Sequence, residues 1–146
     1  MQAVPEHIAR FVLERDLCVL STSSPGGEPH ASIMAYSAEP GLRYIHMATP
    51  ANSRKWANLT ANPRAALLVD DRDTAGSRNS VRALTVLGVL DPLPGEASKR
   101  KVLDLLGAKF GHLKDFFTGP DMEVIRFRPL QLLLLRGAKD AEFIEL

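Results

Sequence analysis

Short apolar runs recur along the chain, separated by clusters of Gly, Pro and polar residues. Some alternate apolar with polar residues, as a strand with one buried face does, and others are continuously apolar over the length of a strand. Turn signals such as Pro25-Gly26-Gly27 lie between them, and Gly88 inside one run predicts a bulge or a close backbone approach. The pattern predicts β-strands over residues 17–22, 30–37, 42–48, 65–69, 82–90, 123–135 and 142–146.

Three other segments carry apolar residues at helical spacing. They are residues 5–15, a short helix that starts after Asn52 or Ser53 and ends before Asn62-Pro63, and residues 96–110. Because the strands are joined mainly by hairpins, we expect a mainly β fold with helices (β + α). Its architecture would be an antiparallel barrel of six or seven strands with helices at its rim.

Composition narrows the class of protein. A chain of 146 residues with 45% hydrophobic and 24% charged residues is expected to form one globular domain, residues 1–146. The formal net charge of +1 gives no reason to expect binding to nucleic acid or to an anionic membrane. No apolar stretch approaches the length of a membrane span, no secretory signal is evident, and Cys18 is the one cysteine, so we expect a cytoplasmic protein.

Two cations stand where a helix disfavours them. The helix that begins near Ser53 carries Arg54 and Lys55 in its first turn and no acidic residue there. The N-terminal end of a helix has a partial positive charge and favours Asp or Glu. An anion bound by free backbone N–H groups, the Ser53 hydroxyl and the two cations would explain this arrangement. The alternative is a solvated pair of basic side chains on an exposed turn.

Residues that carry catalysis or bind metals do not form a recognisable set. The four histidines, His7, His30, His46 and His112, lie on separate predicted elements without the spacing of metal ligands. No serine-nucleophile motif is present, and Cys18 lies within an apolar strand, as a buried structural cysteine does. We therefore expect no metal site, leave the catalytic residues unassigned, and infer that any chemistry depends on a cofactor.

A connected pattern follows the third predicted strand. Thr49 is followed by Ser53-Arg54-Lys55, an apolar helix, Asn62-Pro63-Arg64 and the strand over 65–69. In these residues, and in its order of elements, the chain resembles the pyridoxamine 5'-phosphate oxidase-like family of FMN-binding split barrels. The resemblance implies a split β-barrel, FMN as cofactor, and a homodimer with flavin at the subunit interface acting on a small molecule.

The resemblance also implies roles for particular residues. By position, Thr49, Ser53, Arg54 and Lys55 would hold the FMN phosphate, and residues 33–36 would line the isoalloxazine ring, largely through backbone groups. The full cofactor-binding set that it implies is Ile33, Met34, Ala35, Tyr36, Ala48, Thr49, Ser53, Arg54, Lys55 and Arg82.

The chain departs from the oxidase proper at several positions. The oxidase has an Arg and a Lys at the ends of the strand where this chain has Ala31 and Tyr36, and its C-terminal region contains a histidine that this chain lacks. We therefore expect a flavoprotein oxidoreductase that transfers a hydride or electrons to or from a different small molecule. Alternatives are a non-catalytic flavin-binding or redox-sensing module, a haem-binding or haem-degrading split barrel, and deazaflavin in place of FMN.

Overall fold

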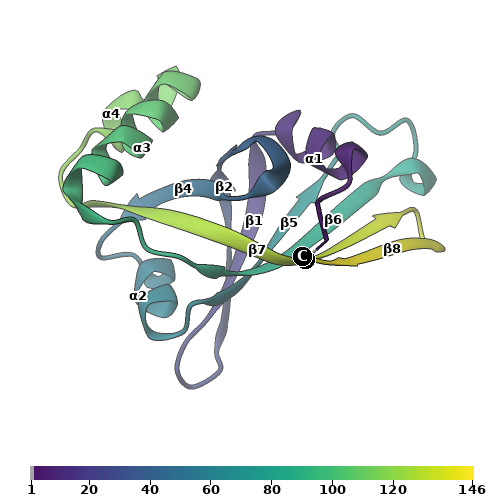
Figure 1. Ribbon diagram of the computed structural model, residues 1–146, viewed down its shortest axis with the longest axis horizontal. Coiled ribbons are helices and arrows are strands. Elements are labelled where there is room, and N and C mark those ends of the chain that lie inside the picture. The colour runs from purple at the N-terminus through teal and green to yellow at the C-terminus, as the bar shows by residue number, and fades with distance from the viewer. Residues whose placement is uncertain (1) are drawn as a thin grey trace.

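A computed structural model describes residues 2–146 and shows one antiparallel sheet of eight strands with four helices (Figure 1). The strands follow the order β2-β1-β5-β6-β7-β4-β3, and β8 pairs with β7. They are β1 (Leu17–Ser23), β2 (Pro29–Ala35), β3 (Ser37–Ala38), β4 (Ile45–Pro50), β5 (Arg64–Asp70), β6 (Arg82–Leu90), β7 (Met122–Arg136) and β8 (Asp140–Glu145). The helices are α1 (Glu6–Leu13), α2 (Arg54–Ala61), α3 (Gly95–Lys109) and α4 (Lys114–Phe117), and the 3-10 turns are η1 (Pro40–Leu42), η2 (Arg78–Ser80) and η3 (Gly111–Leu113).

The two ends of the sheet path meet but do not pair along their length. β2 and β3 are adjacent in the chain and stand at opposite ends of the strand order, so the sheet curls back on itself. β3 pairs with β4 at Ser37↔His46 and Ala38↔Ile45, whereas β2 pairs only with β1. β2 and β4 therefore diverge from a common point and leave a seam. The predicted β + α split-barrel class is confirmed.

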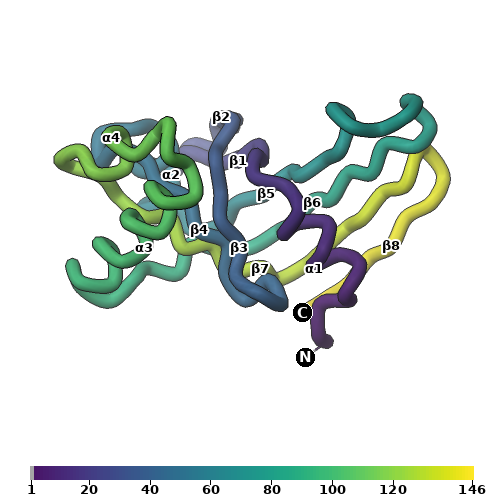
Figure 2. The backbone as a smooth tube through the Cα atoms, turned by 90° about the horizontal axis from the view of Figure 1, so that it is seen from above, coloured from purple at the N-terminus to yellow at the C-terminus, as the bar shows by residue number. Residues whose placement is uncertain are grey.

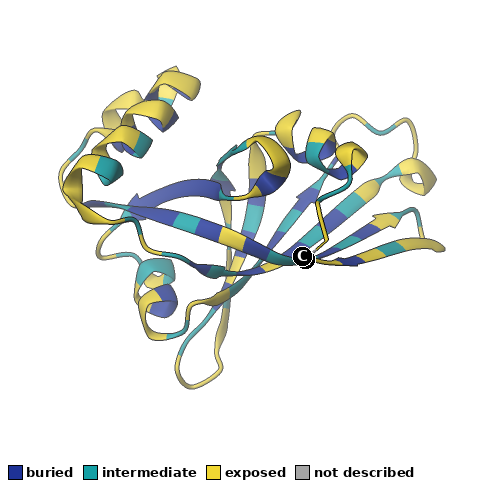
Figure 3. Cartoon of the chain, viewed as in Figure 1, coloured by how far each residue is buried: buried dark blue, intermediate teal, exposed yellow. Residues whose placement is uncertain are grey.

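Most of the core lies inside the curled sheet, and Figure 3 marks the buried residues of the strands in dark blue. Leu20, Val86 and Phe127 from three strands are buried there, and α1 adds Ile8, Phe11 and Val12. Alternation along the strands explains this, since successive side chains point to opposite faces.

A second, smaller cluster lies on the outer side of the sheet. Here α3 and α4, which pack together at one end of the molecule (Figures 1 and 2), cover β4 and β7. Leu103 and Leu106 of α3 and Phe117 of α4 pack with Ala48 and Val124. The outer faces of β4 and β7 are thus buried, which explains why β4 is buried on both sides.

Several predicted boundaries are corrected. The strand expected over 42–48 starts later, because residues 40–42 form η1, where Gly41 and Leu42 have φ values of 74° and 55°. The strand expected over 30–37 is interrupted at Tyr36, which separates β2 from β3. The bulge predicted at Gly88 is confirmed by a register shift between Leu87 and Gly88.

Candidate functional site

A cavity of about 240 Å³ opens where β2 and β4 diverge. The strands provide one side of it, the start of α2 contributes a cation, and η3 with α4 forms another side. Its lining is apolar apart from one threonine and one lysine. The lining residues are Ile33, Met34, Ala35, Ala48, Thr49, Pro50, Lys55, Leu113, Phe116 and Phe117.

The helix beside this cavity begins as the sequence predicts. Ser53 is the N-cap of α2, and its Oγ accepts a hydrogen bond from the Trp56 N–H at 3.2 Å. Thr49 Oγ1 donates to the same Ser53 Oγ at 2.8 Å, which ties the end of β4 to the helix. Helix termini leave their first N–H groups without intrahelical partners, and among residues 2–146 the N–H groups of Arg54 and Lys55 have no acceptor.

The two cations add positive charge to those free donors. Neither Arg54 nor Lys55 forms an ion pair within the described part of the chain, and α2 has no acidic residue in its first turn. Lys55 is half-buried and lines the cavity, whereas Arg54 is exposed beside it. A site with two N–H donors, a hydroxyl, an ammonium and a guanidinium is suited to an anion such as a phosphate.

The structure brings most of the predicted site residues together. Six of them line the cavity, and Ser53 and Arg54 are adjacent to Lys55 at the start of α2. The six are Ile33, Met34, Ala35, Ala48, Thr49 and Lys55.

The side chains of Tyr36 and Arg82 lie elsewhere in this chain. Tyr36 is buried in the core, and its hydroxyl donates to the Val12 carbonyl of α1 at 2.6 Å. Arg82 Nε donates to Asp71 Oδ2 at 2.8 Å, and its guanidinium lies 4.7 Å from the centre of the Phe11 ring. The single chain therefore does not bring either side chain to the cavity.

Sequence reasoning missed the aromatic side of the cavity. Leu113, Phe116 and Phe117 belong to η3 and α4, which follow the helix predicted over residues 96–110. Their i, i+3, i+4 spacing is the signal that could have revealed a further helical turn.

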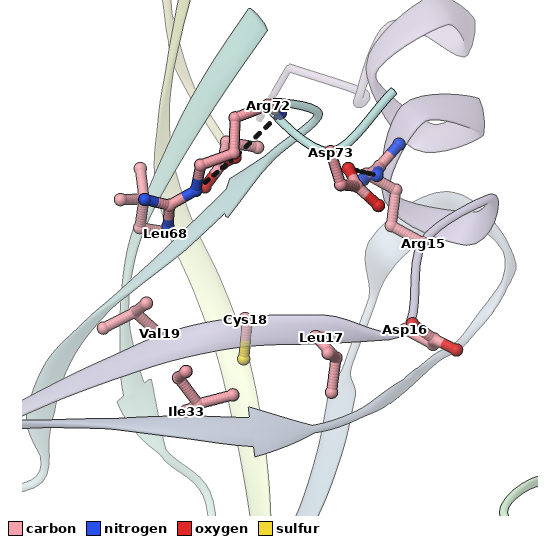
Figure 4. A pocket seen from close by; sticks show the side chains of 10 residues that line it. Arg15, Asp16, Leu17, Cys18, Val19, Ile33, Leu68, Arg72 and Asp73 are labelled. Carbon is pink, nitrogen blue, oxygen red and sulfur yellow. Dashed lines mark hydrogen bonds and ion pairs between the residues drawn. The ribbon is translucent and has the colours of Figure 1, made fainter. Parts of the chain in front are cut away.

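A second cavity, of about 210 Å³, lies on the outer face of the sheet, and Figure 4 shows the side chains that line it. Leu17, Val19, Ile33 and Leu68 give it an apolar floor, and Ile33 lines both cavities. Ion pairs flank it. Arg15 pairs with Asp73, and Arg72 Nε lies 3.0 Å from Asp70 Oδ1.

Cys18 also lies at this second cavity, but it is not a reactive thiol. Burial raises its pKa to about 12, so the thiolate that would act as a nucleophile is scarce near neutral pH. Its Sγ contacts Met47 Sδ at 3.9 Å inside the core.

The outer face continues beyond this cavity as an apolar surface. Cross-strand register places Leu87 and Leu135 on the same face as Leu17 and Ile33. On β8, Phe143 is opposite Leu133 in the same layer. We call Leu17, Ile33, Leu87, Leu135 and Phe143, all of which are exposed, the outer apolar face. Exposed apolar side chains that gather on one face of a sheet are a feature of surfaces that contact a partner.

Residues 2–146 lack two further features. No group of three or more His, Cys, Asp or Glu side chains is placed to hold a metal ion. No helix in this part of the chain combines the length and apolar character needed to cross a bilayer.

Several solved structures share this fold at low sequence identity. HutZ, the haem storage protein from Vibrio cholerae, is 21% identical with a TM-score of 0.74, over 93% of this chain and 96% of that one. General Stress Protein 26 from Bacillus anthracis is 20% identical with a TM-score of 0.69, over 96% and 97%. A haem-binding protein from Mycobacterium smegmatis is 19% identical with a TM-score of 0.77, over 99% of this chain and 60% of that one.

No curated protein matches the sequence significantly. The profile of the family described as pyridoxamine 5'-phosphate oxidase matches residues 4–136, which is most of the chain and includes both β-strand edges of the cavity. The chain belongs to the pyridoxamine 5'-phosphate oxidase family.

Proposed function

We propose that this protein is an FMN-binding flavoprotein that acts as an oxidoreductase on a small molecule. The proposal rests on one observation: the cationic start of α2 borders an apolar cavity between two diverging strands. FMN has the same two parts, a doubly charged phosphate and a largely apolar planar ring. A site in which an anion-binding helix start adjoins an apolar cavity is complementary to both the phosphate and the ring of FMN.

The phosphate end of the cofactor would be held by α2. Arg54, Lys55 and the Ser53 hydroxyl supply charge-assisted and neutral donors, in addition to the free N–H groups of the first turn. Thr49 holds Ser53 in place through their hydrogen bond of 2.8 Å.

The ring end would lie against β2. Ile33, Met34, Ala35 and Ala48 provide apolar contacts there. Because β2 pairs with β1 alone, its other edge has backbone N–H and C=O groups that are available to the polar edge of an isoalloxazine. When bound, FMN would supply hydride or electron transfer, and the protein would contribute binding, orientation and exclusion of water.

A second copy of the chain would complete the site. The cavity of about 240 Å³ is smaller than the roughly 300–1,000 Å³ of typical ligand pockets. Its Ile33 edge is continuous with the outer apolar face, which is uncovered in one chain. We therefore infer a homodimer in which this face is buried and the flavin lies at the subunit interface.

The substrate is a small molecule other than pyridoxine or pyridoxamine 5'-phosphate. Ala31 and Tyr36 stand where the oxidase has cations, and among the residues lining the cavity Lys55 alone is charged. A second phosphate beside the ring would therefore find no further counter-charge in the same chain.

Haem is the second candidate ligand, because two of the similar folds belong to a haem storage protein and a haem-binding protein. Haem iron needs an axial ligand, which in proteins is usually His, Cys, Tyr or Met. The cavity is lined by no His, Cys or Tyr, and its Met34 is its one such donor. This chemistry favours FMN over haem.

Purified protein should be incubated with FMN, riboflavin, a deazaflavin or haemin, freed of unbound ligand, and examined by absorbance. We expect one FMN retained per chain, with the two bands of an oxidised flavin. Retention of haem with a Soret band and no retention of FMN would refute the proposal, as would tighter binding of a deazaflavin than of FMN. Reduction of bound FMN by NADH or NADPH and its reoxidation by an added acceptor would then separate an oxidoreductase from a non-catalytic flavin-binding module.

A further inference from the structure

Phe116 is an aromatic side chain left exposed at the wall of the cavity. It lines the space between β2, β4 and α4, and 46% of it is accessible to solvent. Its neighbour Phe117, which lines the same cavity, is only 2% exposed. Both rings line the cavity, but α4 buries that of Phe117 and leaves that of Phe116 exposed.

Two further aromatic rings pack behind the exposed ring. Phe116 and Phe117 have ring centres 5.5 Å apart at 61°, the edge-to-face arrangement that aromatic pairs prefer. Phe117 in turn lies 6.3 Å from Phe110, which is buried in the outer cluster. Phe116 is therefore supported by packed aromatic residues, Phe117 of α4 and Phe110 at the C-cap of α3.

Another large apolar side chain lines the same cavity from a different element. Ile33 on β2 is 73% exposed, the highest exposure of any large apolar side chain in the part of the chain that the structure describes. Lys55 is the one charged residue of the lining. The cavity thus has exposed apolar contributions from α4 and β2 and a cation from α2, which suits a flat ring that carries an anionic tail.

We infer that Phe116 is the stacking residue of this site: its ring packs against the planar ring of the bound flavin, on a side not contacted by β2. The inference rests on the proposed function for the identity of the ligand. It predicts that affinity has two separable parts, a ring part that depends on Phe116 and a phosphate part that depends on Lys55.

The test measures FMN and riboflavin affinity of the full-length protein by quenching of flavin fluorescence, for the parent, Phe116→Leu, Phe116→Trp and Lys55→Ala. Stacking on an aromatic side chain is worth a factor of about 5 to 150 in affinity per ring. We expect Phe116→Leu to weaken FMN and riboflavin by the same factor, about tenfold on that scale. Phe116→Trp should retain or improve both affinities, and Lys55→Ala should weaken FMN alone.

Leu105→Ala is the matched control, because Leu105 is a half-exposed apolar residue of α3 that does not line the cavity. It should leave both flavins unaffected, and light scattering should give the same mass for every variant. Equal affinities of Phe116→Leu and the parent would overturn the inference while FMN binding by the parent still upheld the proposed function. A loss confined to FMN, or one accompanied by dissociation of the dimer, would equally overturn stacking.

Discussion

The ammonium of Lys109 donates a hydrogen bond to the backbone carbonyl of Tyr36 at 3.0 Å. Lys109 is at the end of α3, and Tyr36 is at the break between β2 and β3, so the contact joins residues 73 positions apart. The ammonium also lies 5.5 Å from the Tyr36 ring and 5.3 Å from the Phe110 ring. This contact fastens the helical side of the cavity to β2, and burial lowers the pKa of Lys109 below its ordinary value.

Lys109→Met tests the strength of that contact. Methionine keeps an apolar stem but leaves the Tyr36 carbonyl without its donor, which we expect to lower the free energy of unfolding by about 1 kcal/mol. Urea denaturation measures the change. Lys101→Met, an exposed lysine of the same helix, is the control and should be nearly neutral. A fall of the same size in both variants would show that the hydrogen bond is not the cause.

Removal of either cation of the α2 start should weaken FMN selectively. Each charge-assisted hydrogen bond is worth about 1.5–3 kcal/mol, or roughly 10- to 150-fold in affinity. We expect Arg54→Ala and Lys55→Ala to lose FMN affinity in this range, and riboflavin, which has no phosphate, to respond little. Isothermal titration with both ligands checks this.

The same two substitutions carry a second expectation. Removing a cation from the first turn should raise the stability of the ligand-free protein by a few tenths of a kcal/mol. Lys101→Ala is the control, because Lys101 is an exposed residue of α3 that does not line the cavity. Unchanged FMN affinity in Arg54→Ala and Lys55→Ala would mean that the two cations are an ordinary solvated pair.

A charge placed on the outer apolar face should separate the proposed dimer. Leu87 lies on β6 in the middle of that face and is 42% exposed. Leu87→Glu would bury an unpaired carboxylate in an interface, which costs several kcal/mol, and we expect a monomer by light scattering. Leu13→Glu is the control, since Leu13 of α1 is similarly exposed but lies off this face. Two variants with the same mass as the parent would exclude Leu87 from the interface.

His46 should make stability depend on pH. It is buried on β4, and burial, together with the Arg126 guanidinium, lowers its pKa below 6.5 despite the nearby Glu39 carboxylate. His46 therefore binds a proton more readily in the unfolded chain than in the folded protein. The free energy of unfolding should fall as the pH decreases through 6.5, and above that pH His46 should have no effect on it.

His46→Asn tests this dependence. It should flatten the fall in stability between about pH 7 and pH 5, measured by urea denaturation at each pH. His112→Asn, an exposed histidine, should keep the parent's profile. If both variants kept the same slope, the pH dependence would belong to other groups.

The sequence was sufficient to predict features that depend on interactions between residues close together in the chain. Ser53 was predicted as one of two possible N-caps, and it caps α2 because its side chain reaches an N–H three residues away. Gly88 was predicted as a bulge or close approach. A Cβ there would lie 2.3 Å from the Arg128 carbonyl oxygen and 2.6 Å from the Phe127 ring, contacts that no side chain tolerates. The cavity residues on the two strands and the cation at the start of α2 were also identified from the sequence.

Contacts between distant segments decided the rest. The path of the chain over 36–45 depends on how β3 meets β4, and the place of Phe116 depends on how α4 packs on the outer side of β4. Arg82 is drawn to Asp71 and Phe11, partners that only folding brings near it. Hydrogen bonds such as that from Lys109 to Tyr36 join residues that are far apart in the chain. Residue spacing cannot predict them, because they stabilise the protein only once folding has brought the two segments together.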